Sequence, residues 1–191
     1  MTETLISCIV SFIGTNIDDI FINTLFFSEA NSRKELRAIV GGNYLGIGAL
    51  VLISVLGAFG LQFFPSRYIG VLGLIPIGLG IKEVIGHRRK KRGEEEQAPP
   101  KKAKGFVLNV MLVSIANGAD NIGVYLPLFA GFSPWQLITA IGVFAGMIAL
   151  WCFLGKKLSD LPSLRRLLVK YKGILVPAVY IALGIYILLK P

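Results

Sequence analysis

Two short segments of the chain combine carboxylates with side-chain amides in the middle of long apolar stretches. Residues 15–20 read TNIDDI and residues 117–122 read NGADNI. Aligned without a gap, both have Asp at the fourth position and Ile at the sixth, and the first, fourth and fifth positions share one face of a helix. Carboxylate and amide oxygens are the ligands of hard divalent cations. The pattern therefore predicts a cation site with the ligands Asp18, Asp19, Asp120, Asn16, Asn117 and Asn121.

Three further polar side chains are secondary candidates for the same site. The Thr15 hydroxyl belongs to the first segment, and Tyr125 follows the second segment by about one helical turn. Asn43 lies five residues into an apolar stretch, where a surface position fits the sequence equally well. Trp151 is expected to be an interfacial anchor or a packing residue.

The acids of the two segments lie where a charge is unfavourable, because an acid at the centre of a membrane helix costs about 2.5–3.5 kcal/mol or more. They could serve only to hold helices together by polar contacts, but asparagine or serine would do so without a charge. No lysine or arginine lies in residues 1–32 or 105–155 to balance them. The pattern thus implies a bound cation, protons or both. It contains no catalytic constellation, so we expect neither an enzyme nor a resident cofactor.

The elements that hold these residues are predicted to be membrane-spanning helices. The 191-residue chain is 54% hydrophobic and only 16% charged, whereas a soluble domain usually carries about 25% charge. Residues 38–61 and 134–155 contain no charge, and each stretch is long enough to cross a hydrocarbon core about 30 Å thick. Hydropathy and helix breakers predict six spans: Thr4–Phe27, Ala38–Phe64, Arg67–Ile85, Gly105–Ala130, Pro134–Gly155 and Gly173–Leu189. The third and sixth are short and contain proline, so we expect them to be kinked.

The loops between these spans alternate in charge. Of the 20 basic residues, 18 fall in the first, third and fifth connections, which the positive-inside rule places in the cytoplasm. Both termini are then extracytoplasmic. This distribution accounts for the net charge of +9 without nucleic acid as a partner.

The central connection divides the chain into two similar units. Residues 87–104 are expected to form a flexible charged linker, or a contact with anionic lipid headgroups, between residues 1–86 and residues 105–191. The two units cross the bilayer in opposite directions. The predicted fold class is therefore an all-α integral membrane protein of six transmembrane helices arranged as two inverted three-helix repeats. Secondary transporters use such repeats to place a substrate site at the bilayer midplane.

Two other residue types have simpler interpretations. Glycines of the third and fifth spans are expected to allow close packing of helices; they are Gly70, Gly73, Gly78, Gly80, Gly142 and Gly146. Cys8 and Cys152 are too few for a disulfide framework. A thiol shuttle would require them to meet, and they are predicted near opposite faces of the membrane.

The strings TNIDDI and NGADNIGVYLPLFA resemble the two signature segments of the cadmium-resistance transporter (CadD) family, within the lysine-exporter (LysE) superfamily. The size, the six spans and the charged central loop agree with this resemblance over essentially the whole chain. It implies a LysE-like fold and efflux of divalent metal cations across a prokaryotic plasma membrane, with cadmium foremost. The motif positions carried over are Asn16, Asp18, Asp19, Asn117, Asp120 and Asn121.

The sequence leaves alternatives open for the transported substrate and for the driving force of transport. Soft cadmium usually binds thiolate, whereas oxygen ligands suit magnesium, calcium or manganese, so zinc or a harder divalent ion is an alternative cargo. No phosphate-binding loop motif is present, and exchange for protons or the membrane potential is the expected drive. The alternative function is export of a basic amino acid of the LysE type, although the carboxylate of that substrate would lack a basic partner. A homodimer is compatible with the sequence.

Overall fold

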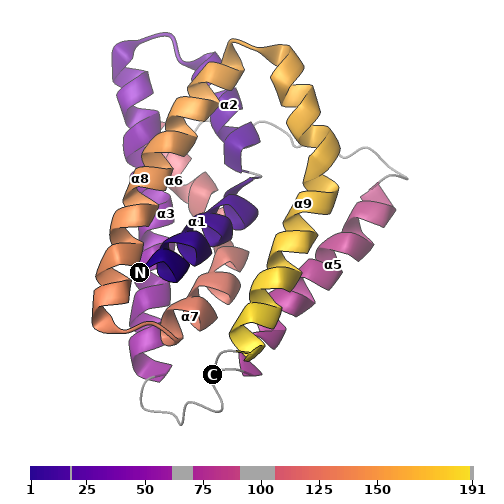
Figure 1. The fold of residues 1–191 in the computed structure, drawn as a ribbon. Coiled ribbons are helices and arrows are strands. Elements are labelled where there is room, and N and C mark those ends of the chain that lie inside the picture. The colour runs from indigo at the N-terminus through magenta and orange to yellow at the C-terminus, as the bar shows by residue number, and fades with distance from the viewer. Residues whose placement is uncertain (18, 62–70, 91–105, 190–191) are drawn as a thin grey trace.

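The computed structural model describes residues 1–17, 19–61, 71–90 and 106–189, and every regular element in these ranges is helical (Figure 1). The first half contains α1 (Thr2–Asn16), α2 (Asp19–Glu29), α3 (Arg33–Leu61) and α5 (Leu74–Lys90). The second half contains α6 (Phe106–Asn117), the 3₁₀ turn η1 (Ala119–Asn121), α7 (Ile122–Ala130), α8 (Pro134–Ser159) and α9 (Pro162–Leu189). The all-α prediction is confirmed for the described part of the chain. Asp18 and residues 91–104 of the predicted linker lie outside the described residues, while α5 extends to Lys90.

The two spans that contain the polar segments are not continuous helices, which corrects the assumption that each segment lies on one helical face. The axes of α1 and α2 differ by 64°, and those of α6 and α7 differ by 72°. Each break falls inside its polar segment, because short polar side chains compete for the backbone hydrogen bonds that would continue a helix. The Thr15 hydroxyl donates to the carbonyl of Ser11 (2.9 Å), and the Asn16 amide donates to that of Phe12 (2.9 Å).

The second break has a different local cause. Gly118 adopts φ −95° and ψ 15°, a sparsely populated backbone region between the helical and extended regions. The backbone N–H of Asn121 then donates to the carbonyl of Gly118 at 3.0 Å, which is the tighter bonding of a 3₁₀ turn. The chain leaves this turn in a new direction as α7.

Side-chain caps begin the long helices α3 and α8. At α3 the backbone N–H of Glu35 donates to the Ser32 hydroxyl at 3.2 Å. Ser133 and Gln136 form a capping box at the start of α8, with Pro134 in the first turn.

α3 and α8 are each long and apolar enough to cross a membrane, and the two bent pairs, α1–α2 and α6–α7, add two more spans if each pair is counted as one. In α9 the apolar part is Pro177–Leu189. The described helices thus support two to four spans, and the full set of six stays a prediction.

The helices pack in three groups. α3 lies along α6 and α7, α8 lies along α1 and α2, and α5 packs chiefly against α9 (Figure 1). Two glycines of α3 face α6 so closely that a Cβ would overlap: at Gly42 it would lie 2.8 Å from the Val107 carbonyl oxygen, and at Gly46 it would lie 2.9 Å from that of Met111. These glycines let the two backbones approach each other.

Of the predicted glycines, Gly80 is confirmed, three are not borne out by the described part of the chain, and Gly70 lies outside the described residues. A Cβ on Gly80 would lie 3.1 Å from the Pro177 carbonyl oxygen, so this glycine does allow α5 to approach α9. At Gly78, Gly142 and Gly146 a Cβ would meet no atom of the described residues within 4 Å. Small size alone does not show which way a helix turns its glycines, because that depends on the neighbouring helix.

A cluster of aromatic rings fills the core between α1, α7 and α8. Phe12 contacts Phe144 and Trp151 with ring centroids 5.4 and 5.3 Å apart, and Phe144 contacts Tyr125 at 4.8 Å and Phe129 at 5.6 Å. Edge-to-face pairs at such distances contribute about 0.5–1.5 kcal/mol each beyond burial. We call these five side chains the aromatic cluster. All of them are buried.

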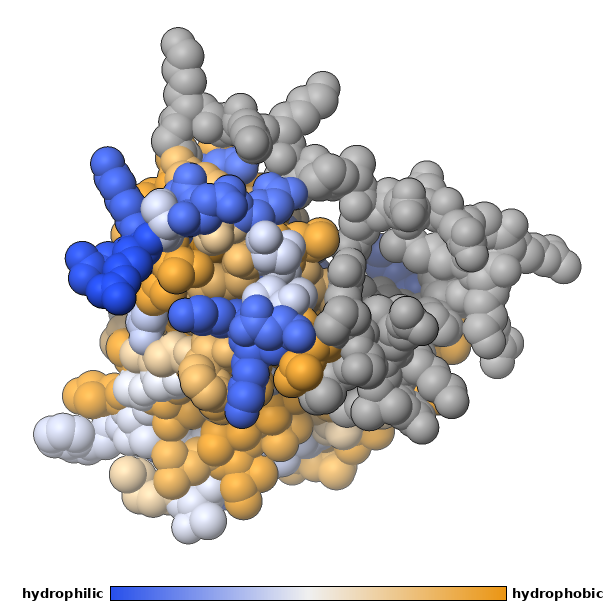
Figure 2. All heavy atoms as spheres, turned by 90° about the horizontal axis from the view of Figure 1, so that it is seen from above, coloured by the Kyte–Doolittle hydropathy of each residue, from blue (hydrophilic) through white to orange (hydrophobic). Residues whose placement is uncertain are grey.

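Five exposed basic residues of α3 and α8 lie at one end of the bundle. α3 begins and α8 ends at the same end (Figure 1), and the exposed basic side chains there are Arg33, Lys34, Arg37, Lys156 and Lys157. Figure 2 looks onto this end and shows hydrophilic side chains on the face nearest the viewer, with hydrophobic residues around and behind them. We call it the basic end.

Candidate functional site

The structure brings the two broken segments into contact with each other. The Asn117 amide at the end of α6 donates to the Asp19 carboxylate at the start of α2. The Asn121 amide lies 3.4 Å from the Asn16 side-chain oxygen. Each contact joins the first or second position of one aligned segment to the fifth position of the other. The two breaks therefore face each other in opposite directions. Four of the six predicted ligands therefore meet.

Asn16 is the centre of a fully buried network beside this contact. Its amide donates to the Thr15 hydroxyl at 2.8 Å and to the Tyr125 hydroxyl at 2.6 Å, and those two hydroxyl oxygens are 2.5 Å apart. Asn16, Tyr125 and Asn121 are all 0% exposed. Two of the three secondary candidates, Thr15 and Tyr125, thus lie together at the breaks.

Trp151 also contacts the first break. Its indole N–H donates to the backbone carbonyl of Asn16 at 2.6 Å, which satisfies a carbonyl that the end of α1 leaves without a helical partner. The expected packing role holds, since Trp151 lies against Phe12, but no sequence signal near Trp151 indicates that α8 passes the break. Only the tertiary arrangement reveals this contact.

A second buried polar group joins α2, α3 and α6. The Asn43 amide donates to the Asn23 side-chain oxygen at 2.7 Å, and the Ser114 hydroxyl donates to the Asn43 side-chain oxygen at 3.2 Å. Asn43 is 1% exposed, so the surface alternative for this residue is wrong. Asn23 and Ser114 were missed, although helical spacing could have found them: they lie one turn from Asp19 and from Asn117 on the same faces. We call these three side chains the amide seam.

Asp120 differs from Asp19 in its exposure to solvent. It is exposed, and the Tyr180 hydroxyl lies 3.5 Å from its carboxylate. Asp19, in contrast, is only 4% exposed. Among the residues described, no three acidic, histidine or cysteine side chains come close enough to hold a metal ion together. Any ion held here would take its remaining ligands from amides, hydroxyls or backbone carbonyls, or from Asp18 outside the described residues.

The chemistry of the contact suits a cation. The Asn121 side-chain oxygen is buried and has no hydrogen-bond partner among the described residues, and a buried oxygen left in this way costs about 1–3 kcal/mol. The Asp19 carboxylate supplies a negative charge, and the Thr15 and Tyr125 hydroxyls supply further oxygens. Such a donor set is typical of hard divalent ions. Cys8 and Cys152 are buried free thiols and take no part in any of these contacts.

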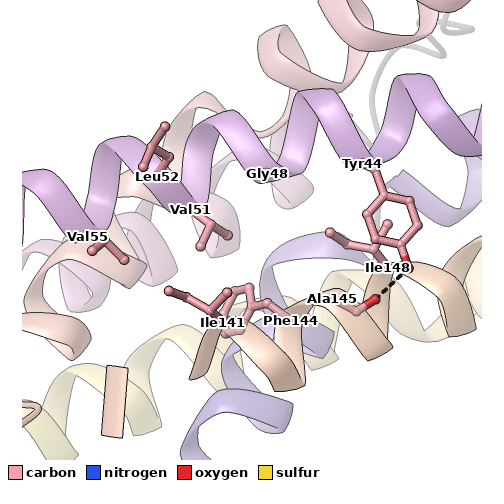
Figure 3. A pocket seen from close by; sticks show the side chains of 9 residues that line it. All are labelled: Tyr44, Gly48, Val51, Leu52, Val55, Ile141, Phe144, Ala145 and Ile148. Atoms are coloured by element: carbon pink, nitrogen blue, oxygen red, sulfur yellow. Dashed lines mark hydrogen bonds between the residues drawn. The ribbon is translucent and has the colours of Figure 1, made fainter. Parts of the chain in front are cut away.

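An apolar groove on the surface of the described structure is a different feature. It lies between α3 and α8, has a volume of about 270 Å³, and is lined by apolar side chains and Tyr44. The Tyr44 hydroxyl already donates to the Ala145 carbonyl at 2.8 Å (Figure 3). The groove therefore offers no free polar group for an ion.

Comparison with known proteins identifies the family. The family model for cadmium resistance transporters matches residues 12–191, which includes both broken segments. The chain belongs to the cadmium resistance transporter family. No curated protein and no solved structure gave a significant match. Membership in this family, together with the apolar helices, makes the chain a multi-pass membrane transporter of the cadmium-resistance type, and its family is one of transporters and not of enzymes.

Proposed function

We propose that this protein exports divalent metal cations, cadmium or a similar ion, across a prokaryotic plasma membrane through the contact between the two breaks. The observation that carries the proposal is the buried Asp19 carboxylate, held by Asn117 where the breaks meet. It lies in a part of the chain, residues 1–32, that contains no lysine or arginine. A divalent ion would balance this charge and would meet the buried Asn121 oxygen.

The broken helices support this location for the site. Discontinuous helices of inverted repeats direct their ends at the substrate in many secondary transporters. Here the carbonyl ends of α1 and α6 lie at the breaks, and the negative end of a helix dipole favours a cation. The α1–α2 pair also runs toward the basic end while α6–α7 runs away from it (Figure 1). Two inverted three-helix repeats would produce this arrangement.

The charge distribution supports an orientation with the basic end in the cytoplasm. Both termini would then be extracytoplasmic, and export would carry the ion away from the basic end. Protons are the proposed counter-ion, because the sequence has no phosphate-binding loop motif through which a nucleotide could drive transport. Asp19 and Asp120, with Asp18, would release metal when protonated.

The experiment is a flux assay in vesicles that carry the purified protein and an internal cadmium-sensitive dye. Asp19→Asn keeps the size of the side chain and an oxygen that can accept from Asn117, but removes the charge. We expect this variant to fold normally and to lose cadmium flux. Asp160→Asn, at an exposed position where α8 ends, is the matched control and should transport like the parent.

The same assay distinguishes the substrate classes. Excess zinc or manganese should compete with cadmium, and excess lysine or arginine should not. Parental flux in Asp19→Asn would contradict the proposed site. Inhibition by lysine with no effect of divalent ions would instead favour export of a basic amino acid.

A further inference from the structure

The amide seam lies on the side of the breaks that faces the basic end. Asn23 follows Asp19 by four residues on α2, and Ser114 precedes Asn117 by three residues on α6, offsets of about 6 and 4.5 Å along the helix axes. α2 runs toward the start of α3 at Arg33, so these offsets point to the basic end (Figure 1). Asn23, Asn43 and Ser114 are 2%, 1% and 6% exposed, respectively.

One donor of the amide seam has no partner in the described part of the chain. The Asn23 amide nitrogen is buried without a hydrogen bond. Its orientation is set by Asn43, whose amide donates both to the Asn23 oxygen at 2.7 Å and to the Ile39 carbonyl at 3.0 Å. Exchanging the oxygen and nitrogen of Asn23 would place two donors face to face. A buried amide N–H in this position requires an acceptor, and a water molecule is the one that a transporter interior can supply.

Aromatic rings fill much of the opposite side of the breaks. The aromatic cluster takes Phe12 from α1 before its break and Phe129 from α7 after its break. The cluster has only two polar groups, the Tyr125 hydroxyl and the Trp151 indole N–H, and both are engaged at the first break. Rings packed in this way leave no polar surface for water. The aromatic cluster thus fills the space between α1, α7 and α8, where buried hydroxyls of α1 (Thr4, Ser7 and Ser11) also lie. Asn23, Asn43 and Ser114 extend polar contacts from Asp19 toward the basic end.

We propose that the amide seam is a hydrated binding site through which a divalent cation passes on its way from the basic end to Asp19, and that the aromatic cluster is the closed side of the pathway. This inference rests on the proposed function. Amide and hydroxyl oxygens can replace part of the hydration shell of a hard cation. A neutral site holds an ion weakly enough to release it to a carboxylate farther along.

A purely structural role makes a different prediction about water. Polar side chains also hold membrane helices together without any water between them, and Gly42 and Gly46 already bring α3 and α6 into close contact. Polar contacts that only hold the helices together would exclude water-soluble reagents. A hydrated site would admit them.

The test is cysteine labelling in a variant without native thiols, Cys8→Ala with Cys152→Ala. Ser114→Cys places a thiol in the amide seam. The matched control is Ser54→Cys, because Ser54, on α3, is also a buried serine and its hydroxyl donates to the Leu50 carbonyl of its own helix. Leu50 packs at Gly118 in the second break, so Ser54 lies one turn farther from the basic end. The probe is ethylammonium methanethiosulfonate, applied to one face of the vesicles with free cysteine as a quencher on the other.

We expect Ser114→Cys to react at least about tenfold faster than Ser54→Cys, because only a hydrated thiol ionises readily, and only from the face that carries the basic end. Cadmium should protect Ser114→Cys from the reagent. It should also dissociate more slowly from that variant, since a thiolate binds it more strongly than a hydroxyl does.

Two outcomes would overturn the inference. The first is a Ser114→Cys variant that transports cadmium like its parent and is no more reactive than Ser54→Cys. The second is labelling from the face opposite the basic end. If Ser114→Cys does not fold, Asn43→Cys tests the same site with the same criteria. Failure of the proposed function would appear separately, as normal flux in Asp19→Asn with any labelling pattern.

Discussion

Two adjacent glycines of α3 allow a test of how closely α3 must approach α6. A Cβ on Gly42 would lie 2.6 Å from the Val110 Cβ and 2.8 Å from the Val107 carbonyl oxygen, while a Cβ on Gly41 would meet no atom of the described residues within 4 Å. We therefore expect Gly42→Ala to destabilise the protein and Gly41→Ala to be neutral or slightly stabilising. The physical reason is that the carbonyl of Val107 belongs to the α6 backbone and cannot rotate away.

The size of the effect follows from the comparison of the two variants. Alanine is favoured over glycine within a helix by about 0.5–1 kcal/mol, and this gain is common to both positions. The difference between the variants is then the cost of overpacking, about 1–3 kcal/mol. For a chain of this length that difference corresponds to roughly 2–12 °C in Tm. The separation of α3 from α6 should also lengthen the 3.2 Å contact between Ser114 and Asn43, so cadmium flux should fall in Gly42→Ala alone.

The measurement is thermal unfolding of the purified variants in one detergent at one scan rate, followed by flux in vesicles. Equal Tm values for Gly41→Ala and Gly42→Ala would refute the close approach of α3 to α6. A lower Tm with unchanged flux would show that the approach matters for stability and that transport does not need the Ser114–Asn43 contact.

Three further changes test contacts at the first break and the role of the thiols. Tyr125→Phe removes the hydroxyl that the Asn16 amide and the Thr15 hydroxyl contact, and should lower the free energy of unfolding by about 1–2 kcal/mol, measured by denaturant titration; no loss would contradict the network. Trp151→Phe removes the donor to the carbonyl at the end of α1 and should lower Tm, whereas Trp135→Phe, at a side chain that is 76% exposed, should not. Replacing both Cys8 and Cys152 by alanine should preserve cadmium flux, and loss of flux with an unchanged Tm would indicate a thiol ligand.

The contrast between polar residues and the apolar stretches around them explains why part of the candidate site could be predicted. The polar segments at residues 15–20 and 117–122 stand out because their acids and amides interrupt long apolar stretches, and a short motif needs no tertiary information to be seen. The same local pattern was misleading about geometry. Both segments are breaks and not helical faces, because their side chains or a 3₁₀ turn take hydrogen bonds that a helix would use.

The remaining site residues were hidden because their partners are far away in the chain. Trp151 contacts Asn16 across 135 positions, and Ser114 contacts Asn43 across 71. Asn43 could not be assigned to the core or the surface until α6 was known to cover it. Asp120 shows that residue type does not determine burial, since it is an aspartate like Asp19, yet the structure leaves it exposed beside Tyr180.

Composition, hydropathy and the distribution of lysine and arginine determined by themselves that this chain forms apolar helices with a few polar residues inside, because the transfer of side chains into a bilayer depends on residue type and order alone. The two polar segments and the family also follow from the order of residues. Only the tertiary structure decided that both segments are helix breaks facing each other and that Asn117 binds Asp19. It also decided that Asn23, Asn43 and Ser114 are joined by hydrogen bonds and that aromatic rings pack between α1, α7 and α8. The reason is that these pairings depend on the relative placement of helices that are remote in sequence, and that placement is set by close packing at a few glycines and rings.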